Sequence, residues 1–270
     1  MPAATGTLRD RVAQRLRRTA HTMLAGMGAP APGQRRWPMS DTESRGPRIA
    51  IRPNGPYVVS GGVPLVVKRP IETERGEPVG WLKETTLDEG AAYALCRCGG
   101  SLRKPFCDGT HATNAFDGSD AEARTGPVKD YAGESMTVHD DRTICEHAGF
   151  CGNQATNVWK MMRNTGDPNV RSQVIAMVER CPSGALSWSS SDSDGTARRI
   201  EPDLPVQVAV IPDGPLWVTG GLPVTASSGQ ALEARNRLTL CRCGSSSNKP
   251  FCDGTHKEVG FQHDPAAPIS

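Results

Sequence analysis

Cysteine and histidine recur in the same order at two places in the 270-residue chain. Both copies follow the spacing Cys-x-Cys-x8-Cys-x3-His and share the segment Lys-Pro-Phe-Cys-Asp-Gly-Thr-His. The donors are Cys96, Cys98, Cys107 and His111 in the first copy, and Cys241, Cys243, Cys252 and His256 in the second. Three thiolates and one imidazole form a four-ligand metal-binding set. We therefore expect one metal site in each copy, rather than buried or disulfide-bonded cysteines.

Such a donor set can hold either zinc or an iron–sulfur cluster. Structural zinc sites are tetrahedral and usually take cysteines that lie two to four residues apart. In iron–sulfur clusters thiolates bind the irons, and imidazole can replace a thiolate. The tighter Cys-x-Cys and the long loop before the third cysteine favour a site wider than one ion. The spacing thus favours iron–sulfur and leaves zinc as the alternative.

The stretch Cys-Asp-Gly-Thr-His, with its upstream Cys-x-Cys and the preceding Lys-Pro, resembles the signature of the CDGSH iron–sulfur family, the NEET proteins. Thr110 and Thr255 stand where that signature usually has serine, and both keep a hydroxyl. The resemblance implies one [2Fe–2S] cluster in each copy. It also implies that the two cysteines of Cys-x-Cys hold the inner iron, while the third cysteine and the histidine hold the outer iron.

An aspartate follows the third cysteine in both copies, as Asp108 and Asp253. Aspartate is a preferred helix N-cap, because its carboxylate accepts hydrogen bonds from free N–H groups of the first turn. We expect each aspartate to be the N-cap of a short helix. This would place His111 and His256 on the first helical turn.

A third group of cysteines lies between the two copies, as Cys145, Cys151 and Cys181. Bacterial ferredoxins combine Cys-x2-Cys-x2-Cys with a remote Cys-Pro, and the outer cysteines of that run are spaced like Cys145 and Cys151. The middle position of the run falls on Ala148, so one corner of the cluster lacks its thiolate. Either the cluster is [3Fe–4S], or His147 supplies the fourth ligand of a [4Fe–4S] cluster.

Residues 128–190 resemble the divergent single-cluster ferredoxin-like domain through Cys-x-His-x3-Cys and Cys-Pro-Ser-Gly-Ala-Leu. The alternative is three buried thiols that bind no metal. Apolar spacing predicts a short strand at 136–139, a short helix after Asn157 and a second helix over 170–180. A returning strand is expected at 186–188.

The duplication extends upstream of the ligands, since residues 51–64 parallel residues 210–223. Each segment has two apolar stretches around a Pro-(Asn/Asp)-Gly-Pro turn, which predicts a hairpin. The first copy has additional residues around 69–90, which we interpret as loop. In the NEET family such β elements pair around a two-fold axis. The two copies could therefore form a pseudo-dimer within the chain, or alternatively each could pair with another chain.

We therefore expect a loop-rich α+β protein with two small β-cap units of the CDGSH type and a small ferredoxin-like α+β unit. The expected domains are a basic helix and linker at 1–45, the first CDGSH unit at 46–118, the ferredoxin-like unit at 128–190 and the second CDGSH unit at 203–265. Glycine (29) and proline (22) are frequent, which indicates small cores with long loops. Small domains of this kind often need a metal to fold.

The N-terminal segment differs from the rest of the chain. Residues 1–36 carry seven arginines and one acidic residue, and apolar residues at helical spacing predict a basic amphipathic helix over 7–27. Such a helix could dock on an anionic membrane or on a partner protein, or serve as an organelle transit peptide. A solvated appendage is the simplest alternative. The mildly acidic remainder gives no reason to expect nucleic-acid binding.

No apolar run is long enough to span a membrane, and no secretory signal follows the N-terminus. Nine cysteines in three metal-binding patterns predict a reducing compartment, and hence the cytoplasm. No nucleophile–base pair, phosphate loop or pair of carboxylates indicates an enzyme. Electron transfer to a redox partner is the favoured function because of the ferredoxin-like unit. The alternatives are cluster storage, transfer or redox and pH sensing, and a structural zinc scaffold.

Overall fold

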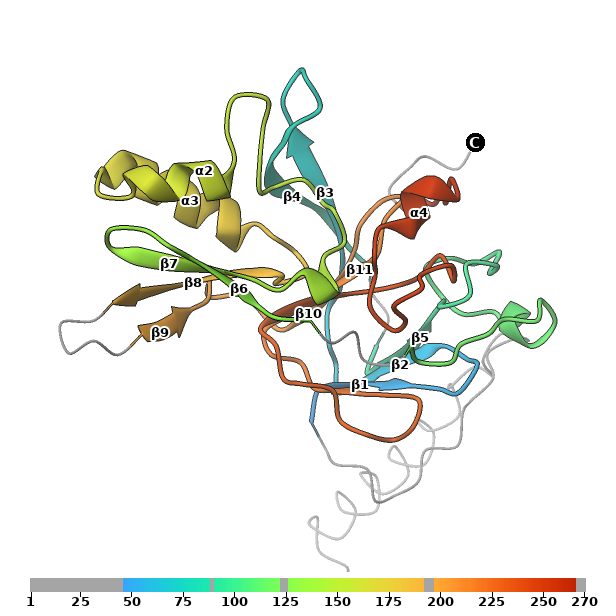
Figure 1. The fold of residues 1–270 in the computed structure, drawn as a ribbon. Coiled ribbons are helices and arrows are strands. Elements are labelled where there is room, and N and C mark those ends of the chain that lie inside the picture. The colour runs from blue at the N-terminus through green and yellow to red at the C-terminus, as the bar shows by residue number, and fades with distance from the viewer. Residues whose placement is uncertain (1–45, 88–89, 122–125, 192–196, 266–270) are drawn as a thin grey trace, which may run out of the picture. The chain divides into compact units, whose positions relative to one another are not determined.

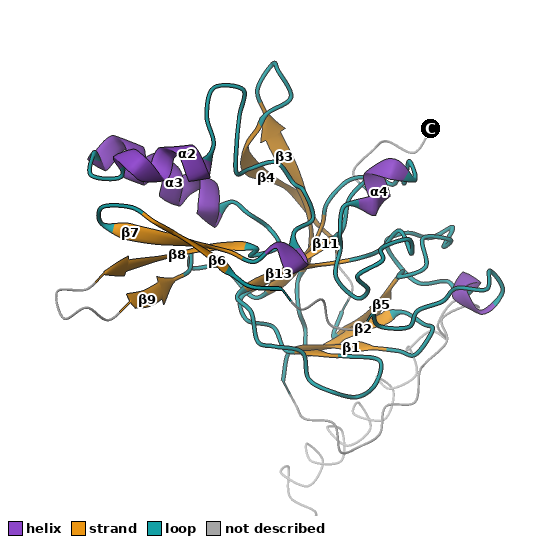
Figure 2. Cartoon of the chain, viewed as in Figure 1, coloured by secondary structure: helices purple, strands orange, loops and turns teal. Residues whose placement is uncertain are grey.

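The computed structural model describes residues 46–87, 90–121, 126–191 and 197–265. All of them lie in the unit Ser44–Ser270. The predicted basic helix over 7–27 lies outside the described residues. In the described part, three β-sheets and a few short helices are joined by long loops, which confirms the loop-rich α+β class (Figure 2). None of the helices in this part is long and apolar enough to cross a membrane.

Both predicted hairpins are present, and each gains a third antiparallel strand that leads into the first cysteine of its motif. Their turns carry Asn54 and Asp213 in the left-handed region, at φ 45° and 52°, which asparagine and aspartate tolerate better than most residues. The strands of the first half are β1 (Arg48–Ile51), β2 (Tyr57–Ser60) and β5 (Ala92–Leu95), and those of the second half are β10 (Gln207–Val210), β11 (Leu216–Thr219) and β13 (Arg237–Leu240).

Each half also lends one strand to the sheet of the other half (Figure 1). Strand β3 (Leu65–Glu72) of the first half pairs in parallel with β10, and strand β12 (Val224–Thr225) of the second half pairs in parallel with β1. The exchange is reciprocal, because β3 and β12 follow the same Gly-Gly-x-Pro turn in the two repeats. The two copies therefore pair within one chain, as the repeat predicts.

The two halves share a large apolar core, and a smaller cluster around Trp217 also contains residues of both. The residues of the large core come from both sets of strands and are almost completely buried, including Ile49, Val59, Leu95, Val208, Val218 and Leu240. Strands β2, β10, β11 and β13 are buried along their whole length. Burial on both faces agrees with the largely apolar sequences of β2, β10 and β11, whereas β13 alternates polar and apolar residues although it is equally buried.

The interpretation of residues 69–90 as loop is wrong. Strand β3 continues to Glu72 and pairs antiparallel with β4 (Pro78–Leu87), with a register shift between Val67 and Lys68. Much of β4 is exposed, and residues 83–86 are all polar, so the segment lacks the regular alternation of apolar residues by which a half-buried strand is recognised. Its largest anchor is Trp81, whose ring centroid lies 4.8 Å from those of Phe150 and Trp217. These partners are distant in sequence, so no local pattern could indicate them.

The segment between the two halves forms its own sheet in the order β6 (Lys129–Ala132), β7 (Met136–Asp140), β8 (Leu186–Ser191) and β9 (Ala197–Ile200). Figure 1 shows α2 (Val158–Met161) and α3 (Pro168–Glu179) on one face of this sheet. The predicted strands and helices are confirmed, and β6 and β9 are additional strands. Helix α3 begins two residues before the predicted start because the Asp167 carboxylate accepts the Asn169 N–H, which caps the helix.

Candidate metal centres

In the first motif, the four predicted ligands form two pairs in the loop that follows β5. The Sγ atoms of Cys96 and Cys98 lie 3.8 Å apart, and the Sγ of Cys107 lies 3.4 Å from Nδ1 of His111. Two donors on one tetrahedral metal are expected to lie roughly 3.5–3.8 Å apart, given metal–sulfur and metal–nitrogen bonds of about 2.3 and 2.0 Å. Each pair therefore has the spacing of two ligands that share one ion.

The second motif repeats this arrangement. Cys241 and Cys243 place their Sγ atoms 3.6 Å apart, and Sγ of Cys252 lies 3.3 Å from Nδ1 of His256. Within the described ranges, no three Cys, His, Asp or Glu side chains converge on one ion position. The donors of both motifs are thus grouped two by two. This grouping fits a two-iron cluster, in which each iron takes one pair of protein ligands.

Both histidines lie on a short helix that begins at a glycine. The 3-10 helix η1 (Thr110–Ala112) and helix α4 (Thr255–Glu258) have Gly109 and Gly254 as N-caps, with φ of 95° and 91°. The expectation that Asp108 and Asp253 are the N-caps is therefore wrong by one residue. The physical reason is the positive φ at the cap position, which glycine adopts without strain and aspartate does not.

The two aspartates still tie each ligand loop together. The Asp108 carboxylate accepts the N–H groups of Thr110 and Leu102 at 3.0 and 2.8 Å. Partial burial would raise the pKa of Asp108, but hydrogen bonds from Thr110 and Leu102 hold this pKa at about 2. Asp253 is held by the equivalent contacts, and its pKa is also lowered. The long loop before the third cysteine is thereby anchored to the helix that carries the histidine.

The cysteine loops of the two halves meet at two glycines. A Cβ atom on Gly99 would collide with the backbone of Cys243, and one on Gly244 would collide with the backbone of Cys98. Both glycines also have positive φ. The close approach of the two loops therefore requires glycine at both positions and makes the two motifs direct neighbours.

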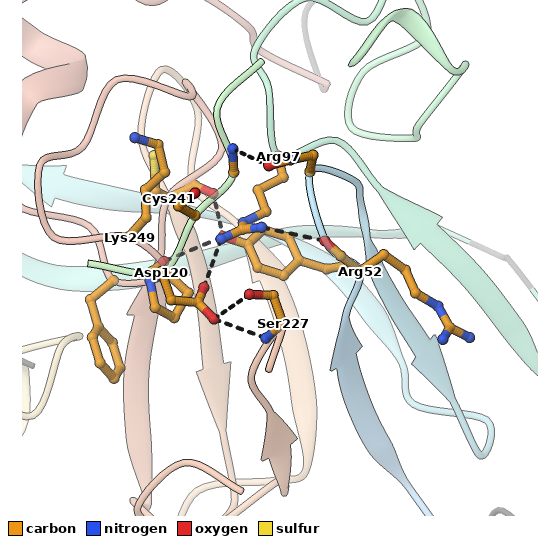
Figure 3. Close-up of polar contacts among 12 residues, drawn as sticks. Arg52, Arg97, Asp120, Ser227, Cys241 and Lys249 are labelled. Atoms are coloured by element: carbon orange, nitrogen blue, oxygen red, sulfur yellow. Dashed lines mark hydrogen bonds and ion pairs between the residues drawn. The ribbon is translucent and has the colours of Figure 1, made fainter. Parts of the chain in front are cut away.

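An arginine lies between the first two cysteines of each motif, and sequence reasoning missed its role. Arg97 is 1% exposed and donates to Asp120 Oδ1 at 2.9 Å and to the carbonyl of Arg52 at 3.5 Å. Asp120 in turn accepts the hydroxyl and the N–H of Ser227 in the second half (Figure 3). The first motif is thus locked to the other half by a buried ion pair. The signal in the sequence was Cys-Arg-Cys in both copies.

The equivalent Arg242 is 2% exposed and has a different set of partners. It donates to the carbonyls of Gly214 and Ile211 and to Nδ1 of His263, each at 2.7 Å. Burial lowers the pKa of Arg242 to about 10. Arg242 also interacts electrostatically with the thiols of Cys96 and Cys243 and with the carboxylates of Asp213 and Asp264. A buried cation therefore lies close to the cysteines of both motifs, which favours a negatively charged occupant.

Tyr57 supports the second motif from the first half. It is fully buried, and its hydroxyl donates to the carbonyl of Cys241 at 2.7 Å. The equivalent residue of the second half is Leu216, which has no hydroxyl to offer the first motif. The two motifs are therefore supported differently by the shared core.

Tyr57→Phe is expected to lower the free energy of unfolding by about 1–2 kcal/mol, since it leaves the buried Cys241 carbonyl without its donor and preserves the ring. Denaturant unfolding of the metal-loaded protein measures the change. Tyr131→Phe is the matched control, because the Tyr131 ring packs on Trp159 and its hydroxyl has no hydrogen bond in the described part of the chain. Equal effects of the two substitutions would contradict a role for the Tyr57 hydroxyl.

The three remaining cysteines converge on one cavity. Cys145 follows the 3-10 helix η2 (Arg142–Ile144), Cys151 precedes α2, and Cys181 follows α3. All three line a cavity of about 150 Å³. A single water molecule needs only about 10–15 Å³ of such volume, so the cavity has room for a group of several atoms. Burial raises the pKa of the Cys145 and Cys151 thiols, because a free thiolate is poorly solvated in this cavity. A bound metal would supply the positive charge that stabilises the thiolate form.

The other walls of this cavity include a buried carboxylate and a cation. Asp140 is 2% exposed, and its Oδ2 accepts Nε of Arg142 at 3.0 Å and Nε1 of Trp159 at 3.1 Å. The Arg142 guanidinium lies over the Trp159 ring and 3.8 Å from Sγ of Cys145. It places positive charge next to the thiolates, where it would stabilise an anionic cluster. Sequence reasoning missed both Asp140 and Arg142.

His147 and Ala148 also line the cavity. Ala148 occupies the position where a ferredoxin has its middle cysteine, so it offers no thiolate there. His147 is exposed, with φ of 59°, and its Cδ2 lies 3.4 Å from the position of a Cβ on Gly254. The ring therefore also faces the second CDGSH-type motif. Its role as a fourth ligand stays a prediction.

Arg237 of β13 anchors the wall that carries Cys181. It is 1% exposed and donates to carbonyl oxygens at the end of α3 and beyond it, at 2.6–3.0 Å: those of Val178, Glu179, Cys181 and Leu186. Its Nε also donates to Glu201. A cation at a helix C-terminus is favourable because the free carbonyls there carry partial negative charge. Since β13 leads directly into Cys241, Arg237 links the middle cavity to the second motif.

The loop of residues 142–151, which carries Cys145 and Cys151, packs directly on the second motif. Asn248 Nδ2 donates to the carbonyl of Thr143, and Lys257 Nζ donates to the carbonyl of His147, both at 2.8 Å. Between them Glu146 is 3% exposed, and burial raises its pKa to about 7. Burial, and then the Glu146 carboxylate, raise the pKa of the Cys252 thiol. The middle cavity and the second motif therefore share a wall.

Comparison with protein families agrees with these centres. Residues 54–112 and 213–257 match the family described as iron-binding zinc finger of the CDGSH type, and residues 131–191 match the family described as divergent 4Fe-4S mono-cluster. No significant match was found among curated proteins or among solved structures. The chain is thus an iron–sulfur protein built from two CDGSH-type iron-binding regions with a divergent 4Fe-4S mono-cluster region between them.

Proposed function

We propose that the chain transfers electrons through two [2Fe–2S] clusters and one [4Fe–4S] or [3Fe–4S] cluster. Bound clusters of these types supply sites that each take up and release one electron. The [2Fe–2S] clusters would be held by Cys96, Cys98, Cys107 and His111 and by Cys241, Cys243, Cys252 and His256. The third cluster would be held by Cys145, Cys151 and Cys181, with His147 as the candidate fourth ligand.

The observation that carries this proposal is the shared wall between the middle cavity and the second motif. Glu146 directly follows Cys145, and its carbonyl oxygen lies only 3.0 Å from the position of a Cβ on Gly254, which is two residues before His256. Electron tunnelling weakens exponentially with distance, so centres separated by one layer of residues exchange electrons readily. A protein that only stored or delivered clusters would not need two different centres in contact.

The side chains around the centres perform two tasks that electron transfer requires. Phe150 is 4% exposed, lines the middle cavity and packs on the Trp81 ring, so it contributes an apolar wall to this site. Arg142 and Arg242 bring positive charge close to the thiolates, which offsets the negative charge added on reduction. Rigid, dry surroundings reduce the rearrangement that accompanies a change in charge.

Cluster transfer to an acceptor is the second candidate function, and one observation favours it. Cys107 and His111 are only half-buried, so the outer pair of ligands of the first motif can be approached from solvent. All nine cysteines are free thiols, in agreement with the proposed reducing cytoplasm. The redox partner would be a protein, and docking through residues 7–27 remains part of this proposal.

Protein purified under anaerobic conditions is expected to be red-brown, with iron in clear excess over zinc, because cluster thiolates give visible charge-transfer bands and zinc sites do not. Absorption, EPR spectra and metal analysis of the full-length chain provide the measurement. Repeated reduction by dithionite and reoxidation should leave the iron content unchanged if the chain carries electrons. Colourless protein with stoichiometric zinc in both CDGSH-type motifs would exclude the proposal, and loss of iron in each redox cycle would favour cluster transfer instead.

A further inference from the structure

The two CDGSH-type motifs have the same ligands but different access to solvent. In the second motif Cys252 is 2% exposed and His256 is 7% exposed. In the first motif the equivalent Cys107 and His111 are half-buried. Since the sequences of these ligand segments are identical, the difference must come from what packs against each motif.

The 142–151 loop covers the second motif. Its carbonyls accept the side chains of Asn248 and Lys257, and the backbone of Glu146 lies against Gly254. The loop thus shields the outer ligand pair of this motif from solvent.

Among the described residues, no segment covers the same surface of the first motif. A Cβ on Gly109 would meet no atom of the described residues within 4 Å, whereas one on Gly254 meets Glu146 and His147. The repeat places Arg103 where the second motif has Asn248, and Ala112 where it has Lys257. Within the described part, the Arg103 side chain forms no hydrogen bond to another element, and Ala112 has no side-chain donor. Leu102, beside them, is 95% exposed.

We infer that the first CDGSH-type site exchanges its cluster with an outside acceptor, whereas the 142–151 loop closes the second site and keeps its cluster in the chain. This inference rests on the proposed iron–sulfur function and assigns different roles to the two CDGSH-type sites. The acceptor would be an apoprotein whose thiolates replace Cys107 and His111 first, because these are the ligands that solvent reaches. The exchange replaces iron–ligand bonds one for one and moves no electrons.

EDTA is a suitable probe because it needs no identified partner. It removes two ferric ions from each oxidised [2Fe–2S] cluster, and the two sulfides leave as hydrogen sulfide with protons from water, so no electron is transferred. In full-length protein, the visible absorbance of the two CDGSH-type clusters is expected to decay in two phases of equal amplitude. The slow phase should be about tenfold slower or more, since it requires local opening of the loop.

Single substitutions assign the phases. Cys107→Ser should remove the fast phase and Cys252→Ser the slow phase, each with a loss of about two irons per chain before EDTA is added. A reversed assignment, or a single phase with one rate, would overturn the inference. If the untreated protein contains no iron in either motif, the proposed function itself fails, and the metal analysis at time zero shows this separately.

A matched pair of double variants tests the cause of the difference. Asn248→Ala with Lys257→Met removes both side-chain hydrogen bonds to the 142–151 loop and is expected to accelerate only the slow phase, by about threefold to tenfold. Arg103→Ala with Ala112→Met changes the equivalent positions of the first motif and should leave both rates unchanged. An unchanged slow phase in the first double variant would show that the loop does not protect the second site.

Discussion

Cys181→Ala is expected to empty the middle site and leave both CDGSH-type clusters in place. Iron should fall from about seven or eight atoms per chain to about four, and the EPR signal of the cubane-type cluster should disappear. The physical reason is that Cys145, Cys151 and Cys181 are the only thiols that line the cavity in the described part of the chain, so two of them cannot hold the cluster against solvent. Iron and sulfide analysis with EPR of the anaerobic protein makes the measurement.

One control variant separates this loss from general misfolding, and a further variant tests the fourth ligand. Cys252→Ser should remove about two irons, belonging to one [2Fe–2S] cluster, and retain the cubane-type signal. In the same experiment, His147→Ala tests the fourth ligand: conversion of a [4Fe–4S] signal to [3Fe–4S] supports ligation by His147, which lies at the cavity rim. An iron content that Cys181→Ala leaves unchanged would reject the middle site.

The grouping of the predicted donors follows from the sequence because each motif is local. Cys96 to His111 lie in one continuous segment after β5, and Cys107 and His111 lie close together on either side of Gly109. The same holds for the hairpins, whose turns are specified by Asn54 and Asp213. A sequence pattern indicates the geometry of neighbouring residues, and the spacing within each Cys–Cys and Cys–His pair is set mainly by neighbouring residues.

The features that distinguish the two motifs could not be predicted in this way. They depend on partners far away in the chain, such as Asn248 with Thr143 and Trp81 with Phe150. Strand β4 is an example, since its pairing with β3 and the packing of Trp81 on distant rings fix its position, and no regular apolar pattern in its own sequence indicates it. The parallel pairing of β3 with β10 is likewise set by the shared core.

The same limitation applies to the buried arginines. Nothing local shows that Arg237, in a strand of mixed composition, reaches the end of α3, or that Arg97 and Arg242 are almost completely buried. Sequence reasoning expects arginine at the surface, because burying a charge is costly unless hydrogen bonds satisfy it. In this protein the free carbonyls at a helix end and at tight turns provide those bonds, and only the folded structure brings them together.

Arg237→Met is expected to lower the free energy of unfolding by about 3–5 kcal/mol, in the range typical of breaking a buried charged network. Methionine fills much of the space but cannot donate, so the carbonyls of Val178, Glu179, Cys181 and Leu186 lose a buried partner. Because these groups hold the end of α3, the wall that carries Cys181 should loosen. Denaturant unfolding of the loaded protein measures the first effect, and retention of the middle cluster in EDTA measures the second.

Arg199→Met is the matched control, because Arg199 of strand β9 lines the same cleft as Arg237 but is exposed. Its effect should stay within about 0.5 kcal/mol, as is usual for a surface position. Arg237→Met should also speed loss of the middle cluster more than loss of the cluster at Cys96, Cys98, Cys107 and His111, which Arg237 does not touch. A destabilisation below about 1 kcal/mol, or equal acceleration at all centres, would show that Arg237 contributes general packing rather than the link between α3 and the second motif.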